Sequence, residues 1–323
     1  MNLKNYSKLD ISIVIGANEN FIIPCLESIY KNYEHPANIF VTSNLSSQLI
    51  CKKIQKMFPC VHIIENTIRK GFAENHNNVI EKTNGEYILI LNDDTVILNQ
   101  SIKKLINYLD MHPNVAIISP KLLNPDLSLQ QSTYSFPSLF TSTLNLLGIR
   151  KMIPFNNLTY RLMSIFYKKG QSRFWKHDKI CKVDTLKGAC MMVRRNTMKN
   201  IGLMDEVSLA YGEETEWHCR FKKKGWEIIF YPEAEVIHYG KQTTKNQPLC
   251  IEEEKIKGLL NFYKKHKSKF SYYFLRVIII FTFFFRYVFS LIALNRKTDN
   301  LHLHIIKIAQ NPEEVFQRKR IFY

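Results

Sequence analysis

The stretch from Gly85 to Ile97 constrains the fold of this chain more than any other. An unbroken apolar run, Tyr87 to Leu91, stops at Asn92-Asp93-Asp94 before apolar residues resume. A short apolar run bounded by polar residues is typical of a strand buried on both faces, as in a parallel sheet. Carboxylates at the C-terminal end of such a strand lie where open α/β sheets bind ligands. Taken alone, the three polar residues are better explained as an ordinary strand-end turn, because Asn and Asp favour turns.

The two adjacent aspartates call for positive charge nearby. Asp93 and Asp94 repel each other, and a divalent cation that also holds a diphosphate would compensate both carboxylates.

Apolar runs alternate with segments of helical periodicity over the first 120 residues. We expect strands at 11–15, 39–41, 61–64, 87–91 and 115–119, and helices at 22–33, 49–58, 72–82 and 101–111. This alternation implies right-handed βαβ units and a parallel sheet. The polar strand ends at Asn18, Asn44 and Asp94 would then share one edge, where a nucleotide-binding crevice is expected.

The second half of the chain gives a weaker pattern. We expect strands at 190–193, 226–231 and 235–238 and a helix at 213–224. Residues 124–131 are rich in turn formers. Residues 136–175 mix apolar and basic side chains, which suits either a surface that meets a membrane or an acceptor, or an irregular covering layer.

The C-terminal region has a different composition. Residues 272–294 are nearly all apolar over about the length of a membrane span. Arg276 and Arg286 interrupt this stretch, and an Arg in mid-span costs roughly 2.5 kcal/mol or more. Because lysines and arginines flank it, we favour an interfacial helix on an anionic leaflet, with a full span as the open alternative. We therefore divide the chain into an α/β domain, 1–250, and a helical, membrane-associating region, 251–323.

Charge and cysteine content narrow the classes of function. The formal net charge of +17 favours anionic partners such as lipid head groups or phosphorylated substrates. We exclude nucleic acid, because the sequence shows no groove-like cluster of basic and aromatic residues. Seven cysteines without a C-x-x-C pair fit reduced thiols in the cytosol. The polar first ten residues lack the apolar core of a signal peptide, so we do not expect export.

Two segments downstream carry candidate chemistry. Three glutamates lie within four positions at the start of the predicted helix 213–224, and one of them could act as a general base. The alternative is structural: acidic residues stabilise a helix N-terminus, and Glu216 could pair with Arg220. His238 ends an apolar strand. If that strand joins the same sheet, His238 and Asp94 form a carboxylate–imidazole set suited to Mg or Mn.

The ordered motifs resemble family 2 glycosyltransferases, inverting enzymes of the GT-A fold, and most closely their rhamnosyltransferase-like branch. The resemblance covers about residues 11 to 245. It rests on Ile13-Val-Ile-Gly-Ala-Asn18, Gly71-Phe-Ala-Glu-Asn-His-Asn77, Leu91-Asn-Asp-Asp-Thr95, Ser128-Leu-Gln130, Val183-Asp to Gly188-Ala-Cys, Gly202-Leu-Met-Asp-Glu206, Glu213-Glu-Thr-Glu-Trp-His-Cys-Arg220, Pro232-Glu-Ala234 and His238. Each block alone is weak, whereas the ordered set is specific.

The resemblance implies a role for each matching residue. Asp94 and His238 would bind a divalent metal, Mg or Mn. Glu214 falls at the position of the family's catalytic base, with Glu213 the neighbouring candidate. The nucleotide-sugar would contact Gly16, Ala17, Asn18, Asn44, Phe72, Asn77, Asn92, Asp93, Gly188 and Ala189.

Three departures from the family's pattern stand out. Gly16-Ala17-Asn18 replaces the usual T-Y-N, Ser43 stands where a carboxylate near the nucleoside is usual, and Glu214 stands where Asp is commoner.

The resemblance implies an inverting glycosyltransferase at the cytoplasmic face of the membrane. It would move a sugar, with dTDP-rhamnose the expected donor, to a lipid-linked or cell-surface glycan. The missing carboxylate motivates the alternative of a catalytically weak, membrane-attached binding or assembly subunit that keeps the fold.

Overall fold

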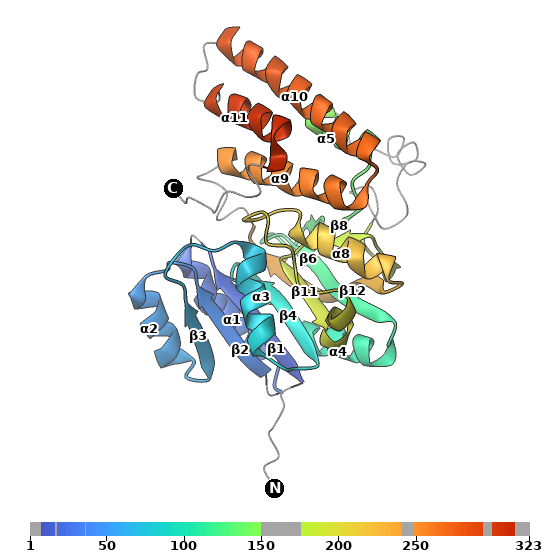
Figure 1. The fold of residues 1–323 in the computed structure, drawn as a ribbon. Helices are drawn as coiled ribbons and strands as arrows, with labels where there is room; N and C mark the ends of the chain where they lie inside the picture. Colours follow the sequence, from blue (N-terminus) through green and yellow to red (C-terminus); the bar gives the residue numbers. More distant parts are fainter. Residues whose placement is uncertain are drawn as a thin grey trace.

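The computed structural model describes residues 8–16, 18–35, 37–149, 176–240, 248–292 and 299–313. A large mixed sheet has helices on both faces, and a layer of further helices lies beyond one edge of this α/β body (Figure 1). The arrangement confirms the predicted α/β class with a mixed, mostly parallel sheet. Ala17, most of the basic stretch 136–175 and the end of the apolar stretch 272–294 lie outside the described residues.

The first half of the sheet is parallel. Its strands lie in the order β3-β2-β1-β4, and the register sets Val14 beside Asn92 and Ile15 beside Ser43. The polar ends of these strands therefore share one edge, as the sequence predicts. The elements are β1 (Leu9–Ile15), η1 (Glu19–Phe21), α1 (Ile22–Asn32), β2 (Ala37–Ser43), α2 (Gln48–Met57), β3 (Val61–Glu65), α3 (Phe72–Lys82) and β4 (Tyr87–Asn92).

The second half of the sheet is mixed. The order continues from β4 through β11, β6, β12 and β5, with β11 antiparallel to both its neighbours and β12 parallel to β6. The short strands β7 and β9 pair with β6 and β12, and β8 and β10 form a separate two-stranded sheet. The elements are β5 (Thr95–Ile97), α4 (Ser101–Met111), β6 (Val115–Leu123), β7 (Leu129–Gln130), β8 (Thr133–Tyr134), β9 (Cys181–Lys182), β10 (Thr185–Leu186), β11 (Cys190–Arg194), η2 (Arg195–Asn200), α8 (Glu213–Lys223) and β12 (Glu227–His238).

The prediction of two strands at 226–231 and 235–238 was wrong. The structure has one strand, β12, whose pairing with β6 shifts register between Tyr231 and Glu235. Pro232 has no N–H to give to a ladder, so an irregularity at this point keeps the strand continuous while the pairing skips. The shift leaves His238 at the end of the strand, next to β5.

Two apolar cores lie on opposite faces of the sheet. Alternate residues of β4 face opposite cores: Tyr87, Leu89 and Leu91 join the core under α1, α2 and α4, while Ile88 and Ile90 join the core under α3 and α8. β4 is therefore buried on both faces, which explains its unbroken apolar run.

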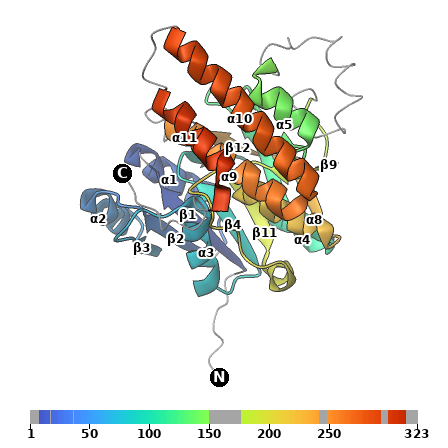
Figure 2. The same ribbon diagram turned by 45° about the horizontal axis from the view of Figure 1, so that its top comes forward.

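A third core belongs to the helical layer. It joins α5 (Leu139–Leu146), α9 (Pro248–His266), α10 (Lys269–Ile292) and α11 (Asp299–Gln310), which lie together in both views (Figures 1 and 2). α10 is long and apolar enough to cross a membrane, and 28% of its most apolar window is buried. Its two arginines bind neighbouring helices, Arg276 through the carbonyl of Ala309 and Arg286 through Glu252 and the carbonyl of Leu146.

α9 is hydrogen-bonded to, and closely packed against, the segment that leads into α8. The Leu209 N–H donates to Glu254 at 2.6 Å, and His266 lies 2.9 Å from Glu216. The backbones meet where Gly212 faces Gly258: a Cβ on Gly212 would come within 2.8 Å of the Gly258 Cα, and a Cβ on Gly258 would overlap the carbonyl oxygen of Tyr211. Only glycine allows this approach, so the helical layer and the start of α8 are packed backbone to backbone.

We expect Gly258→Ala to destabilise the protein by about 1–3 kcal/mol, because the new methyl group overpacks a contact made by backbone atoms. Urea denaturation measures the free energy of unfolding. Gly225→Ala is the control: Gly225 has φ +87° but open space around it, so this variant measures strain without a clash. A Gly258→Ala protein more stable than the wild type, as helix propensity alone predicts, would contradict the close contact.

We expect His76 to make the stability of the protein depend on pH. This side chain is buried with Nδ1 2.7 Å from Ser12 Oγ, and burial lowers the pKa of His76 to about 3. Below about pH 6.5 the unfolded chain binds a proton on His76, whereas His76 of the folded protein stays neutral down to about pH 3. The free energy of unfolding therefore falls as pH drops from about 6.5 towards 3. In His76→Asn the free energy of unfolding should fall less steeply between pH 6 and 4, by about 1.4 kcal/mol per pH unit. Equal slopes in pH-dependent urea titrations would refute this.

Candidate active site

The turn between β4 and β5 places two carboxylates at the edge of the sheet. Antiparallel pairing of β5 with β12 sets His238 opposite Thr95, which brings its ring to the turn. His238 Nε2 lies 3.3 Å from Asp94 Oδ1 and 3.4 Å from Asn92 Nδ2. The second oxygen of Asp94 accepts from the Gly240 N–H at 2.9 Å. Although burial opposes it, contact with His238 and the Gly240 N–H lowers the pKa of Asp94.

The other nitrogen of His238 is oriented by Gln130. Gln130 Oε1 lies 2.6 Å from His238 Nδ1, while the amide nitrogen of Gln130 donates to the carbonyl of His238. Because Gln130 presents its oxygen, Nδ1 carries the proton. The Nε2 lone pair then faces Asp94 across 3.3 Å, an arrangement that requires a proton or a metal ion between the two atoms.

This pair fits a divalent metal. Two ligands about 2.1 Å from one ion, at about a right angle, lie about 3 Å apart. Within the described residues no group of three or more His, Cys, Asp or Glu side chains could hold a metal ion. A pair of protein ligands suits Mg²⁺ and similar ions when substrate phosphates and water complete the coordination.

Asp93 points to a different partner. Its Oδ2 accepts from the Gly16 N–H at 2.7 Å, so it ties the end of β1 to the end of β4. Burial, assisted by the charge of Asp94, raises the pKa of Asp93 to about 7. Gly16, which we predict to contact the nucleotide-sugar, is therefore bonded to Asp93, while Ala17 lies outside the described residues. Asn18 caps η1 by accepting from the Asn20 N–H.

Asn44 and Asn77, both predicted to line the nucleotide pocket, bond different parts of the protein. Asn44, at the end of β2, bonds the carbonyl and the N–H of Lys70 and so holds the loop before α3 on the ligand edge of the sheet. Asn77 is buried, and its side chain bonds the backbone of Met204 and the Glu206 carboxylate. The structure therefore gives Asn77 a structural link between α3 and the loop before α8.

The loop before β11 approaches the turn closely. Ala189 accepts from the Asn92 N–H at 2.9 Å, so this loop flanks the aspartates. A Cβ on Gly188 would come within 3.2 Å of the Phe72 ring, which leaves little room for any other residue. The structure thus brings together Gly188, Ala189, Phe72 and Asn92, four of the residues expected near the donor.

The glutamates begin α8 as predicted, and their environments differ. Glu213 is buried, with Oε2 lacking a hydrogen-bond partner among the described residues, and burial beside Glu214 raises its pKa well above the usual range. Glu214 is half-buried and accepts from the Gly212 N–H. Burial also raises the pKa of Glu214, while the charge of Lys187 opposes that shift. The structural reading holds for Glu216, which binds Arg220 at 2.8 Å.

Lys187 links the metal-type pair to Glu214, and the sequence analysis assigned this lysine no role. Its Nζ donates to Gln130 Oε1 at 2.8 Å and lies 3.3 Å from His238 Nδ1, while its charge acts on Glu214. A signal was available, because Lys187 directly precedes Gly188 and Gln130 closes the Ser128-Leu-Gln130 block. The arrangement sets a metal-type pair and a cation at one sheet edge, and the cation acts electrostatically on a carboxylate with a raised pKa.

Comparison with known proteins identifies the family of the chain. The model of a family described as glycosyltransferase like family 2 matches residues 11–253. An N-acetylglucosaminyl-diphospho-decaprenol L-rhamnosyltransferase from Mycobacterium tuberculosis is 23% identical over 236 residues, 69% of this chain and 73% of that protein. A low-salt glycan biosynthesis hexosyltransferase from Haloferax volcanii is 22% identical over 250 residues, 76% of this chain and 70% of that protein.

Solved structures share the fold. GalNAc-T7, solved with UDP, GalNAc and Mn²⁺, has a TM-score of 0.59 at 15% identity over 84% of this chain and 50% of its own, so the match spans half of it. A mannosyltransferase from Pyrobaculum calidifontis, solved with GDP-Man and Mn²⁺, has a TM-score of 0.54 at 11% identity over 95% of this chain and 87% of its own. These likenesses confirm the expected GT-A fold. With the family model matching most of its length, this chain belongs to the glycosyltransferase-like family 2.

Proposed function

We propose that this glycosyltransferase transfers a sugar, with inversion, from a nucleotide-diphospho-sugar to a hydroxyl of a lipid-linked glycan. The observation that carries the proposal is Lys187, which contacts His238 of the metal-type pair and acts electrostatically on Glu214. Donor diphosphate and acceptor hydroxyl would meet across this lysine.

The side chains divide the work of the transfer. Asp94 and His238 would hold the divalent metal, Mg or Mn, which supplies charge compensation for the departing diphosphate. Gln130 holds the His238 ring in place, and Lys187 donates in turn to Gln130 Oε1. Glu214 takes the proton of the acceptor hydroxyl while the hydroxyl oxygen attacks the anomeric carbon. The raised pKa of Glu214 suits a base near neutral pH. One displacement from the face opposite the diphosphate inverts the configuration.

The relatives support the choice of substrates. The mycobacterial relative is named for transfer of L-rhamnose to N-acetylglucosaminyl-diphospho-decaprenol. We propose dTDP-rhamnose as donor and a saccharide on a polyprenyl diphosphate as acceptor. A catalytically weak subunit, the alternative motivated by Ser43, would bind the same partners without turnover.

We expect dTDP-rhamnose with Mn²⁺ to raise the melting temperature, since a ligand at 100 times its Kd adds about 2.7 kcal/mol to stability. Asp94→Asn should remove the Mn²⁺-dependent part of this shift. Glu214→Gln should retain the shift and lower turnover by about 10²- to 10⁴-fold, because it loses only the base. Thermal-shift and donor-hydrolysis assays measure both effects.

Two exposed positions provide matched controls, Asp126→Asn and Glu81→Gln. A larger shift with a UDP-sugar than with dTDP-rhamnose would overturn the donor assignment. Donor binding without any turnover in the wild type would favour the weak subunit.

We also propose that α10 lies on the membrane surface at the cytoplasmic face. Its inward face packs in the third core, while Phe281, Phe285 and Phe289, spaced four residues apart on one side, are exposed by 53–71%. Arg276 and Arg286 bind α11, α9 and α5 rather than a partner across a bilayer. A helix with one face held by protein and an aromatic face outward suits an interfacial position.

We expect the triple variant Phe281→Ser, Phe285→Ser, Phe289→Ser to bind anionic lipid vesicles at least tenfold more weakly, because each buried Phe contributes about 1.5–3 kcal/mol. Vesicle sedimentation measures the bound fraction. The control replaces Leu49, Met111 and Leu127, exposed by 61–79% elsewhere, with Ser. Equal loss of binding in both triple variants, or none in either, would count against an α10 membrane face.

A further inference from the structure

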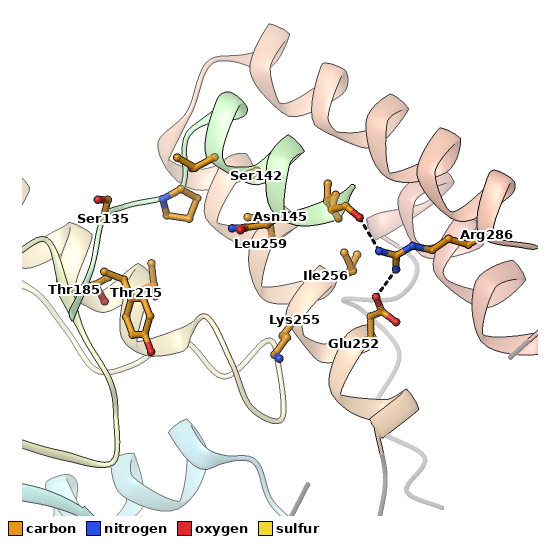
Figure 3. A pocket seen from close by; sticks show the side chains of 14 residues that line it. Ser135, Ser142, Asn145, Thr185, Thr215, Glu252, Lys255, Ile256, Leu259 and Arg286 are labelled. Atoms are coloured by element: carbon orange, nitrogen blue, oxygen red, sulfur yellow. Dashed lines mark hydrogen bonds and ion pairs between the residues drawn. The ribbon is translucent and has the colours of Figure 1, made fainter. Parts of the chain in front are cut away.

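A cavity of about 440 Å³ lies where the helical layer meets the α/β body. Helices α5 and α9 contribute its walls; Thr185 and Thr215 lie at one side and Arg286 of α10 at the other (Figure 3). Its volume is within the range of about 300–1,000 Å³ of small-molecule sites. No role assigned above uses this cavity.

The cavity reaches the first turn of the helix that carries the candidate base. Thr215 lines the cavity and directly follows Glu214 on α8. Thr185 belongs to β10, and its hydroxyl lies 2.8 Å from His218 Nδ1, one turn further along α8. A molecule in the cavity would therefore contact the helix that carries Glu214.

The lining has the chemistry of a saccharide site. Hydroxyl groups and an amide face the cavity beside apolar carbon, as hydrogen bonding to sugar hydroxyls and packing against a sugar's C–H face require. The hydroxyl groups include those of Ser135, Thr141 and Thr215, the amide belongs to Asn145, and Leu259 supplies apolar carbon.

The charges in the lining do not favour a diphosphate. Arg286 donates to Glu252 at 2.6 Å and to the carbonyl of Leu146 at 2.6 Å, so its guanidinium is engaged within the protein. The second cation of the lining is Lys255, whose Nζ lies 5.0 Å from the centre of the Tyr211 ring. Phosphate groups are bound by clusters of cations and backbone N–H groups, and Glu252 offsets one of these two cations.

We infer that this cavity binds the neutral saccharide unit of the lipid-linked acceptor. The inference rests on the proposed glycosyl transfer and names where that reaction's second substrate sits. Arg286 belongs to α10, the helix that also carries the exposed phenylalanines. The cavity thus lies between α8, which carries Glu214, and the helix proposed to touch the membrane, so the lipid chain could stay in the bilayer while its sugar reaches Glu214.

The experiment fills the cavity from one wall and measures binding, not turnover. Asn145 is exposed at the end of α5 and lines the cavity, so Asn145→Trp should occupy its space. Leu147→Trp is the matched control, two residues away, half exposed and outside the lining. The probes are a short-chain N-acetylglucosaminyl-diphospho-isoprenol and the same isoprenyl diphosphate without its sugar, titrated into the full chain.

We expect the sugar-bearing probe to bind the wild type and Leu147→Trp alike and Asn145→Trp at least tenfold more weakly. The sugarless probe should bind the wild type at least tenfold more weakly than the sugar-bearing one. Undiminished binding to Asn145→Trp, no binding of the sugar-bearing probe to the wild type, or equal binding of both probes would overturn the inference. Nucleotide-sugar binding with Mn²⁺ is measured in parallel, so failure of the donor refutes the proposed reaction separately.

Discussion

The pairing of β5 with β12 is the contact on which the site depends. β5 follows the aspartate turn, and its ladder with the distant strand β12 sets His238 against Asp94. β12 lies between β6 and β5: it pairs with β6 on both sides of the register shift at Tyr231–Glu235, and its C-terminal end also pairs with β5. Gln130 then fixes the ring, because it bonds both the imidazole and the carbonyl of His238.

A second contact joins this chemistry to the helical layer. Gly212 and Gly258 meet without side chains, and Glu254 and His266 hold the segments on either side of the glutamates that begin α8. α9 therefore helps to position the candidate base Glu214. Because α9 packs against α10, a membrane position for α10 would also orient the active site towards lipid-linked substrates.

Local sequence patterns were sufficient to predict the helices and strands whose formation depends on burial alone. The apolar run of β4 and the helical spacing of α3 and α4 predicted these elements to within a residue, since β4 is buried on both faces and each helix packs one apolar face against one core. The pattern predicted two strands where β12 is one. The interruption at Pro232 is a register shift in the pairing with β6, not a break in the strand. The family resemblance implied that Asn77 contacts the nucleotide-sugar; in the structure its side chain bonds Met204 and Glu206, which are distant in sequence.

The sequence by itself determined the α/β class, the ligand edge of the sheet and the candidates Asp94, Glu214 and His238, because strand ends and ordered motifs are local features. Tertiary structure alone decided that Lys187 lies beside His238 and acts electrostatically on Glu214, that glycines bring α9 against the start of α8, and that Thr215 lines a polar cavity. These features depend on side chains and backbones that meet only when distant segments pack, and no local periodicity records such distances.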